Sequence, residues 1–346
     1  MRKGQNPAKM GLQAHQASRL GVLLPLYIPT PGGYYANSLD IFKYQLASLY
    51  QNTSQEFDLL VFDNGSCQVV KDALQKLQSD GWIDWLILSR HNIGKTGAMN
   101  WGFRALQNEL ICYSDADVYF RPGWFDQSLE ILNTFPHTGM VTAQPCFYDC
   151  LAGKGQAHLV MQAREQFPIS DQPADAGAME EYVHSIGDIV DLQGRYNHHI
   201  WRIINNPTTG VEAIIGASHF QFMAYKSLLE QITPLPAIYG LNRKDDYHII
   251  SRIDQIGFLQ LSTLKPYVYH MGNNLDDITR EDIQRDGTQE VLLDTFARSV
   301  TAQGDQISRV KKVVLKIFYA FSRFDSFSNL LLRIYNFLFE YYTREK

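Results

Sequence analysis

The sequence predicts an α/β fold, in which a mostly parallel, Rossmann-like sheet is flanked by helices. Three observations lead to this prediction: short continuous apolar runs, helical spacing of apolar residues between the runs, and polar turns where the runs end. A continuous apolar run is typical of a parallel strand, because both faces of such a strand are buried. Alternation of these runs with helical segments is the pattern of successive βαβ units.

The first third of the chain gives the elements in regular order. The run "GVLLPLYI" at 21–28 predicts a strand that ends at "PTPGG", and helical spacing follows Asn37. A second strand is predicted in "FDLLVFDNGS", and residues 69–78 return to helical spacing. "WLILS" at 85–89 predicts a third strand, "TGAMNWGFRALQ" a third helix and "ELICYSDAD" a fourth strand.

The pattern is weaker in the second half. Residues 150–210 show no strand alternation and predict helices and loops that cover the site. Residues 211–224 predict one strand, followed by a helix from Ser227. "NRKDDYHIISRIDQIGF" predicts a further helix and "KPYVYHMGNN" a late strand that opens into a loop. From Thr279 the chain is predicted to be largely helical.

Composition narrows the class of protein. The chain has 346 residues, 45% of them hydrophobic and 19% charged, which is enough for a large core. Its formal net charge of −5 gives no general attraction to nucleic acid. The four cysteines predict reduced thiols in a cytoplasmic protein rather than a disulfide framework. No run approaches the roughly 18–20 apolar residues that cross a bilayer.

Polar turns follow three of the predicted strands. "DNGS" ends the second strand, "RHNIGKTG" follows the third and "DAD" ends the fourth. Ligands of open α/β sheets bind beyond the carboxyl ends of the strands. The three turns therefore predict one site at one edge of the sheet.

Two acids in "DAD" are candidate metal ligands. Residues two apart in a strand point to the same face, so Asp115 and Asp117 are expected on one side. Two hard oxygen ligands suit Mg²⁺ or Mn²⁺, which take further ligands from water and substrate phosphates. The alternative is a solvated strand end, since this DXD pattern is common. His270, at another predicted strand end, is a candidate imidazole ligand or a structural histidine.

Three other segments have a functional and a structural interpretation. Asp63 either accepts hydrogen bonds from a base or sugar or only shapes the "DNGS" turn. Gly94, Lys95 and a helix amino end in "HNIGKTGAMN" favour an anion such as pyrophosphate, although the segment is neither a Walker A loop nor GxGxxG. Asp245 and Asp246 either complement a helix dipole or supply a general base.

Taken together, these segments resemble a family 2 glycosyltransferase with the glycosyltransferase A-type fold. The resemblance covers residues 20–275 and rests on the order of "VLLPLY", "VFDNGS", "HNIGKTGAMNWG", "YSDADVYFRPGW", "GASHFQFMAYKSLL", "KDDYHIISRI" and "YHMG". It implies inverting, non-processive transfer of a sugar from a nucleotide-diphosphate donor to a hydroxyl of a glycan, lipid-linked or other acceptor. It also implies Mn²⁺ or Mg²⁺ as cofactor, and favours a UDP-sugar over a GDP-sugar.

The same resemblance implies roles for single residues. Asp63 would contact the nucleobase in a pocket that Pro25 and Tyr27 also line, while Asn92, Gly94 and Lys95 would lie by the nucleotide and sugar. Asp115 would lie near the ribose and the metal, and Asp117 and His270 would bind the metal. Asp246 would be the catalytic base. Many relatives carry Glu-Asp where this chain has Asp245-Asp246, so a role for Asp245 in placing the acceptor is open.

We expect three parts in the chain. Residues 1–19 are a basic arm, 20–275 the catalytic domain and 276–346 a helical extension. The nucleotide-sugar half of the domain is expected at about 20–125 and the acceptor half at about 140–275. The amphipathic, Lys-rich helices expected in 306–346 contact either a membrane surface, such as the inner face of the cytoplasmic membrane, or protein. The functional alternative is a catalytically degenerate protein that binds a nucleotide-sugar or a glycan.

Overall fold

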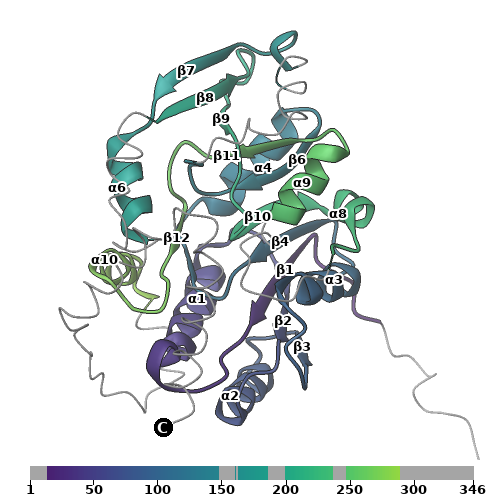
Figure 1. The fold of residues 1–346 in the computed structure, drawn as a ribbon, viewed down its shortest axis with the longest axis vertical. Coiled ribbons are helices and arrows are strands. Elements are labelled where there is room, and N and C mark those ends of the chain that lie inside the picture. The colour runs from purple at the N-terminus through teal and green to yellow at the C-terminus, as the bar shows by residue number, and fades with distance from the viewer. Residues whose placement is uncertain (1–13, 148–159, 161–162, 186–198, 237–246, 289–346) are drawn as a thin grey trace, which may run out of the picture.

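The computed structural model describes residues 14–147, 160, 163–185, 199–236 and 247–288. These residues form a ten-stranded sheet of order β3-β2-β1-β4-β10-β6-β11-β9-β8-β7, with a small sheet of β12 and β5 beside it (Figure 1). The strands are β1 (Leu20–Leu26), β2 (Phe57–Asp63), β3 (Trp85–Leu88), β4 (Leu110–Ser114), β5 (Val118–Phe120), β6 (Thr138–Thr142), β7 (Ile169–Pro173), β8 (Ile200–Asn205), β9 (Glu212–Ile215), β10 (Gln221–Tyr225), β11 (Leu259–Ser262) and β12 (Val268–His270).

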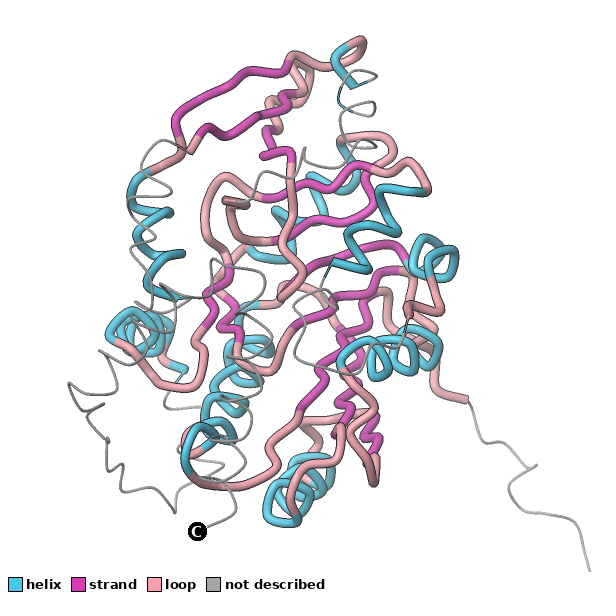
Figure 2. Tube along the Cα trace, in the orientation of Figure 1, coloured by secondary structure: helices cyan, strands magenta, loops and turns pink. Residues whose placement is uncertain are grey.

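Helices cover the two faces of the large sheet. They are α1 (Ser38–Asn52), α2 (Gln68–Ser79), α3 (Lys95–Ala105), α4 (Trp124–Thr134), α6 (Ala176–Ser185), α8 (Lys226–Ile232), α9 (Tyr247–Gln255) and α10 (Asp277–Asp286). Alternate residues of β1 point to opposite faces, so Val22 and Leu24 pack with α1, α2 and α4, while Leu23 packs with α3, α8 and α9. Figure 2 shows the strands running through the middle of the molecule with helices outside them. The predicted α/β class is confirmed.

The parallel part of the sheet is its first half. β1 pairs in parallel with β2 and β4, and β2 pairs in parallel with β3. Beyond β4 the sheet is mixed, since β10 runs antiparallel to β4 and β6 while β6 and β11 are parallel. The carboxyl ends of β1 to β4 therefore meet at one edge, which is where the predicted polar turns lie.

Two predictions for the second half are wrong. The segment expected to be one strand at 211–224 forms β9 and β10, and the chain turns between them at Gly216–Phe220. The described residues of 150–210 contain the strands β7 and β8 as well as α6, although helices and loops were expected. β7 is the last strand of the sheet and is mostly exposed, so its sequence lacks the apolar pattern of a buried strand.

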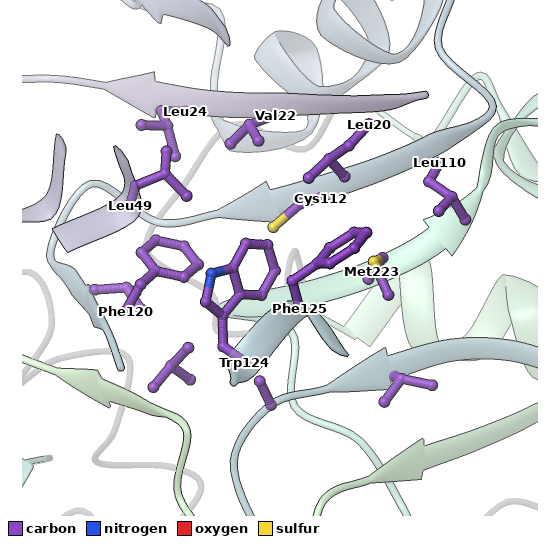
Figure 3. Close-up of a cluster of buried hydrophobic side chains, with 14 of the residues drawn as sticks. Leu20, Val22, Leu24, Leu49, Leu110, Cys112, Phe120, Trp124, Phe125 and Met223 are labelled. Atoms are coloured by element: carbon purple, nitrogen blue, oxygen red, sulfur yellow. The ribbon is translucent and has the colours of Figure 1, made fainter. Parts of the chain in front are cut away.

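The core beneath the site is centred on Trp124. This side chain is fully buried among β1, β4, β10 and α1, next to Cys112, Phe120 and Phe125 (Figure 3). Its indole Nε1 donates to Thr53 Oγ1 at 3.1 Å, so the buried N–H has a partner. "DAD" connects β4 to β5, and this cluster packs against both strands.

The predicted ends of the chain fall mainly outside the described residues. Of the expected extension 276–346, the structure describes the segment to Thr288, which contains α10. The amphipathic helices expected in 306–346 and most of the basic arm 1–19 lie outside it. Among the residues that are described, no helix is both long and apolar enough to span a bilayer.

Candidate functional site

A pocket of about 640 Å³ lies at the carboxyl edge of the parallel strands. Its walls come from the segments after β1, β2, β3, β4 and β12. They are Pro25, Leu26, Tyr27, Ile28, Tyr34, Tyr35, Ser38, Ile41, Asn64, Asn92, Gly94, Lys95, Tyr113, Asp115, Ala116, Asp117, Gly272 and Asn273. The structure thus brings the three predicted polar turns into one place.

Asp115 is compensated by a lysine and a tyrosine. Lys95 Nζ lies 2.8 Å from Asp115 Oδ1 and 2.9 Å from Oδ2. Tyr113 Oη donates to Asp115 Oδ1 at 2.7 Å, and the Lys95 ammonium also lies 5.7 Å from the centre of the Tyr113 ring. The negative charge of Asp115 is therefore already balanced by Lys95. This distinguishes Asp115 from Asp117, the second acid of the turn.

Asp117 lies beside a histidine. Asp117 Oδ2 is 3.4 Å from His270 Nε2, and both side chains keep over a quarter of their surface exposed. Burial raises the pKa of Asp117, the neighbouring Asp115 raises it further, and His270 and Lys95 oppose these effects. A cation near Asp117 would therefore stabilise the charged form of its carboxylate.

The small sheet places His270. β12 pairs antiparallel with β5, and this register sets His270 opposite Val118, the residue after Asp117. The imidazole packs edge-on against Phe220, whose backbone oxygen accepts from Asp115 N at 2.7 Å. Residues more than 150 positions apart in the sequence are therefore neighbours in the site.

The donor set suits a divalent cation in part. No group of three His, Cys, Asp or Glu side chains arranged for a metal occurs among the described residues, so Asp115, Asp117 and His270 are not a preformed three-ligand cluster. Asp117 and His270 form an adjacent carboxylate–imidazole pair, whereas Asp115 is paired with Lys95. Mg²⁺ and Mn²⁺ accept few protein ligands when water and phosphate oxygens complete the shell, so this pair fits such an ion.

Asp63 is not among the residues that line the pocket, and its expected contact with the nucleobase stays a prediction. Asp63 is fully buried; its Oδ1 accepts from Ser66 N at 3.0 Å, and its Oδ2 lies 4.0 Å from Lys71 Nζ. The alternative interpretation, a residue that shapes the turn, is the one the contacts support. The side chain of the turn that faces the pocket is Asn64.

Asn64 organises the neighbouring loop. Its Oδ1 accepts from Ile93 N at 2.8 Å, and its Nδ2 donates to Asn92 Oδ1 at 3.1 Å and to Gly94 O at 3.2 Å. Gly94 has φ 78°, a conformation that side chains disfavour, and it directly precedes α3. The predicted residues Asn92, Gly94 and Lys95 all line the pocket, next to the amino end of this helix.

The segment after β1 forms an aromatic wall. The predicted Pro25 and Tyr27 line the pocket, and Tyr34 and Tyr35 line it too, although the sequence analysis did not select them. The Tyr34 and Tyr35 ring centres are 5.1 Å apart, and those of Tyr35 and Tyr27 are 6.4 Å apart. Adjacent tyrosines after two glycines in "PGGYY" were the available signal.

Comparison with known proteins gives this arrangement a family. Residues 36–187 match the family model described as Glycosyl transferase family 2. This match identifies a family 2 glycosyltransferase domain within these residues, which are less than half of the chain. A curated relative, an uncharacterized glycosyltransferase of Nostoc sp., is 26% identical over 94 residues, which are 27% of this chain and 29% of that protein. The alignment thus spans less than a third of the relative's length.

Two solved structures are similar over most of the chain. TarS of S. aureus is 14% identical with a TM-score of 0.44, covering 90% of this chain and 74% of that chain. The mannosyltransferase PcManGT from Pyrobaculum calidifontis, solved with GDP-Man and Mn²⁺, is 14% identical with a TM-score of 0.42, covering 91% of this chain and 84% of that chain.

The pocket is built from residues inside and outside the matched segment. Residues 36–187 contain Asn64, the Asn92–Lys95 loop and the Asp115–Asp117 turn. Tyr27 precedes this segment and His270 follows it, and the sheets bring both to the same edge. Asp245 and Asp246 lie outside the described residues, so a catalytic role for them stays a prediction.

Proposed function

We propose that this glycosyltransferase domain transfers a sugar from a nucleoside diphosphate donor to an acceptor hydroxyl, with a divalent cation held at Asp117 and His270. The observation that carries the proposal is that one pocket is lined by two groups of side chains, one uncharged and aromatic and the other charged. We call the first group, with Pro25, Tyr27 and Tyr34, the aromatic end, and the second, with Lys95, Asp115 and Asp117, the charged end. A nucleoside diphosphate has the same two parts, a flat uncharged base and an anionic diphosphate.

The charged end suits the diphosphate. The Lys95 ammonium and the backbone N–H groups at the amino end of α3 both favour an anion. Asp115 holds Lys95 in place through its two carboxylate oxygens. Lys95 therefore acts as a fixed cation of the site.

A divalent ion at Asp117 and His270, Mn²⁺ or Mg²⁺, would supply Lewis-acid stabilisation of the departing diphosphate. Its protein ligands would be one carboxylate oxygen and one imidazole nitrogen, the two atoms that lie 3.4 Å apart. Burial disfavours the charged form of Asp117 and so raises its pKa. A cation bound at this carboxylate would offset that electrostatic cost.

The remaining parts of the proposal rest on the sequence. We propose an inverting reaction, in which Asp246 takes the proton of the acceptor hydroxyl as it attacks the anomeric carbon; general bases contribute about 10²–10⁴-fold. Asp245 would place the acceptor. Uridine is the first base to test, since it was favoured by the resemblance.

Thermal unfolding of the full chain with UDP or GDP, each with and without Mn²⁺, tests the proposal. Ligands that bind the native state stabilise it by RT ln(1 + [L]/Kd), about 2.7 kcal/mol at 100-fold excess over Kd. We expect one nucleotide to raise Tm with Mn²⁺, and this increase to be lost in Asp117→Asn. The increase within each variant is compared, because removing the charge of Asp117 also alters the unliganded protein.

The matched control is Asp126→Asn. Asp126 is an exposed acid of α4 that accepts from Ser54 Oγ at 2.7 Å and does not line the pocket, so this variant should respond as wild type does. A wild-type protein that no nucleotide stabilises would contradict the proposal. Sugar-nucleotide turnover in the wild type then separates an enzyme from a degenerate binding protein.

A further inference from the structure

A short segment after β12 crosses the pocket from its charged end to its aromatic end. At the charged end, His270 Nε2 lies 3.4 Å from Asp117 Oδ2, and Met271 N donates to Asp117 O at 2.7 Å. Gly272 and Asn273 then line the pocket. We call residues 270–274 the strap.

At its other end the strap is joined to the segment after β1. Asn273 Nδ2 donates to Tyr34 O at 3.2 Å. Asn37 Nδ2 donates to Asn274 Oδ1 at 3.3 Å. Two neighbouring asparagines of the strap are thus bonded to residues more than 230 positions earlier in the chain. The two segments contact each other over the aromatic end of the pocket.

Tyr34, whose backbone accepts from the strap, is a large aromatic side chain that is mostly exposed. Tyr34 lies in a one-turn 3₁₀ helix, Gly33–Tyr35, and 57% of its surface is exposed although it lines the pocket. Tyr34 and Tyr27 both stand nearly perpendicular to Tyr35, at 80° and 79°. Tyr34 is therefore joined to Tyr27 through Tyr35 in one aromatic wall of the pocket.

We propose that Tyr34 stacks on the nucleobase of the donor and that Asn273 is the residue that positions it. This inference rests on the proposed function, since it names the contact that the base of the donor makes. Asn273 acts through the Tyr34 backbone and not through contact with the reacting atoms. The strap then fixes the two ends of one ligand, because His270 and Asn273 belong to the same five residues.

Binding of nucleotides to the full chain tests this assignment by calorimetry with Mn²⁺ present. Loss of base stacking on an aromatic side chain weakens binding by roughly 5- to 150-fold. We expect Tyr34→Ala to weaken UDP binding at least fivefold and to leave inorganic pyrophosphate binding unchanged, since pyrophosphate has no base. Tyr34→Phe keeps the ring and should bind UDP as wild type does.

The positioning role of Asn273 is tested by a double-mutant cycle. Asn273→Ala should weaken UDP binding by roughly threefold to tenfold, the range of one hydrogen bond. In the Tyr34→Ala background the same change should have no further effect, because Asn273 acts through Tyr34. Asn205→Ala is the matched control: its Nδ2 donates to Glu212 Oε1 at 2.8 Å, outside the pocket.

The outcomes separate the inference from the proposed function. Wild-type affinity in Tyr34→Ala, or independent multiplication of the two effects in the double variant, would overturn the strap assignment and leave nucleotide binding in place. If Asn273→Ala lowers only Tm, with UDP affinity unchanged, Asn273 is structural and the assignment is wrong. Failure of the wild type to bind either UDP or GDP would remove the proposed function itself.

Discussion

At the scale of single residues, the pairing of Lys95 with Asp115 determines how charge is divided in the pocket. Replacing Lys95 by methionine leaves a three-quarters-buried Asp115 with Tyr113 as its remaining partner described above. We expect Lys95→Met to lower the free energy of unfolding by about 1–3 kcal/mol and to weaken UDP binding about tenfold or more. Urea unfolding and calorimetry measure the two effects.

Lys43 provides the matched control for this prediction. Its Nζ lies 3.0 Å from Asp40 Oδ1, the two side chains are similarly part-buried, and neither lines the pocket. Lys43→Met should therefore leave UDP affinity unchanged. Equal losses of affinity in the two variants would show that Lys95 acts through general electrostatics rather than at the diphosphate.

The residue scale is also where prediction from sequence succeeded and failed most clearly. Lys95, Asp115 and Asp117 could be placed in one site because polar residues at the ends of parallel strands meet at one edge. Asn64, which lines the pocket, was not selected, since a shift of one residue at the strand end reverses which side chain faces the pocket. Tyr34 was missed because it lies in the segment after the predicted strand, and Asn273, which donates to its backbone, is distant in the sequence.

At the scale of elements, close packing of α9 against β6 depends on Gly139. A Cβ atom at this position would lie 2.6 Å from Ile253 Cγ2 and 2.8 Å from Phe258 Cβ, and Ile253 is fully buried. Gly139→Ala should lower the free energy of unfolding by about 1–3 kcal/mol, because overpacking forces helix and strand apart. Urea denaturation provides the measurement.

Gly32→Ala is the comparison for this packing prediction. No atom lies within 4 Å of a Cβ built at Gly32, and its φ of −137° is open to any residue. This variant should change stability by less than about 0.5 kcal/mol. If Gly139→Ala is as stable as Gly32→Ala, α9 has more freedom to move against β6 than these contacts indicate.

Elements were predictable where burial gives them a pattern. β1, β2 and β4 are buried along almost their whole length and were recognised as continuous apolar runs. β7 is exposed at the edge of the sheet and carries the polar sequence "ISDQP", so no apolar pattern marks it. β9 and β10 were merged into one strand because both are apolar and the turn between them is short.

At the scale of the whole molecule, a largely buried arginine connects elements from distant parts of the chain. Arg121 follows β5 and pairs with Glu181 of α6 and Asp282 of α10, and its guanidinium also lies 5.6 Å from the centre of the Tyr269 ring in β12. Burial raises the pKa of Glu181, and Arg121 opposes this shift. β5 and β12 are the strands that place Asp117 beside His270, so this ion network supports the proposed metal pair from outside the pocket.

Arg121→Met tests how much the network contributes. The variant leaves Glu181 without its arginine and Asp282 with Arg285 as its remaining ion-pair partner described here, and breaking a buried pair costs about 3–5 kcal/mol. Arg202→Met breaks the exposed pair with Asp171 and should cost about 1 kcal/mol or less. We expect urea unfolding to show this difference, and Mn²⁺-dependent nucleotide binding to weaken in Arg121→Met alone. If the two variants are equally stable, the alignment of β5 with β12 comes from their backbone pairing rather than from the ion network.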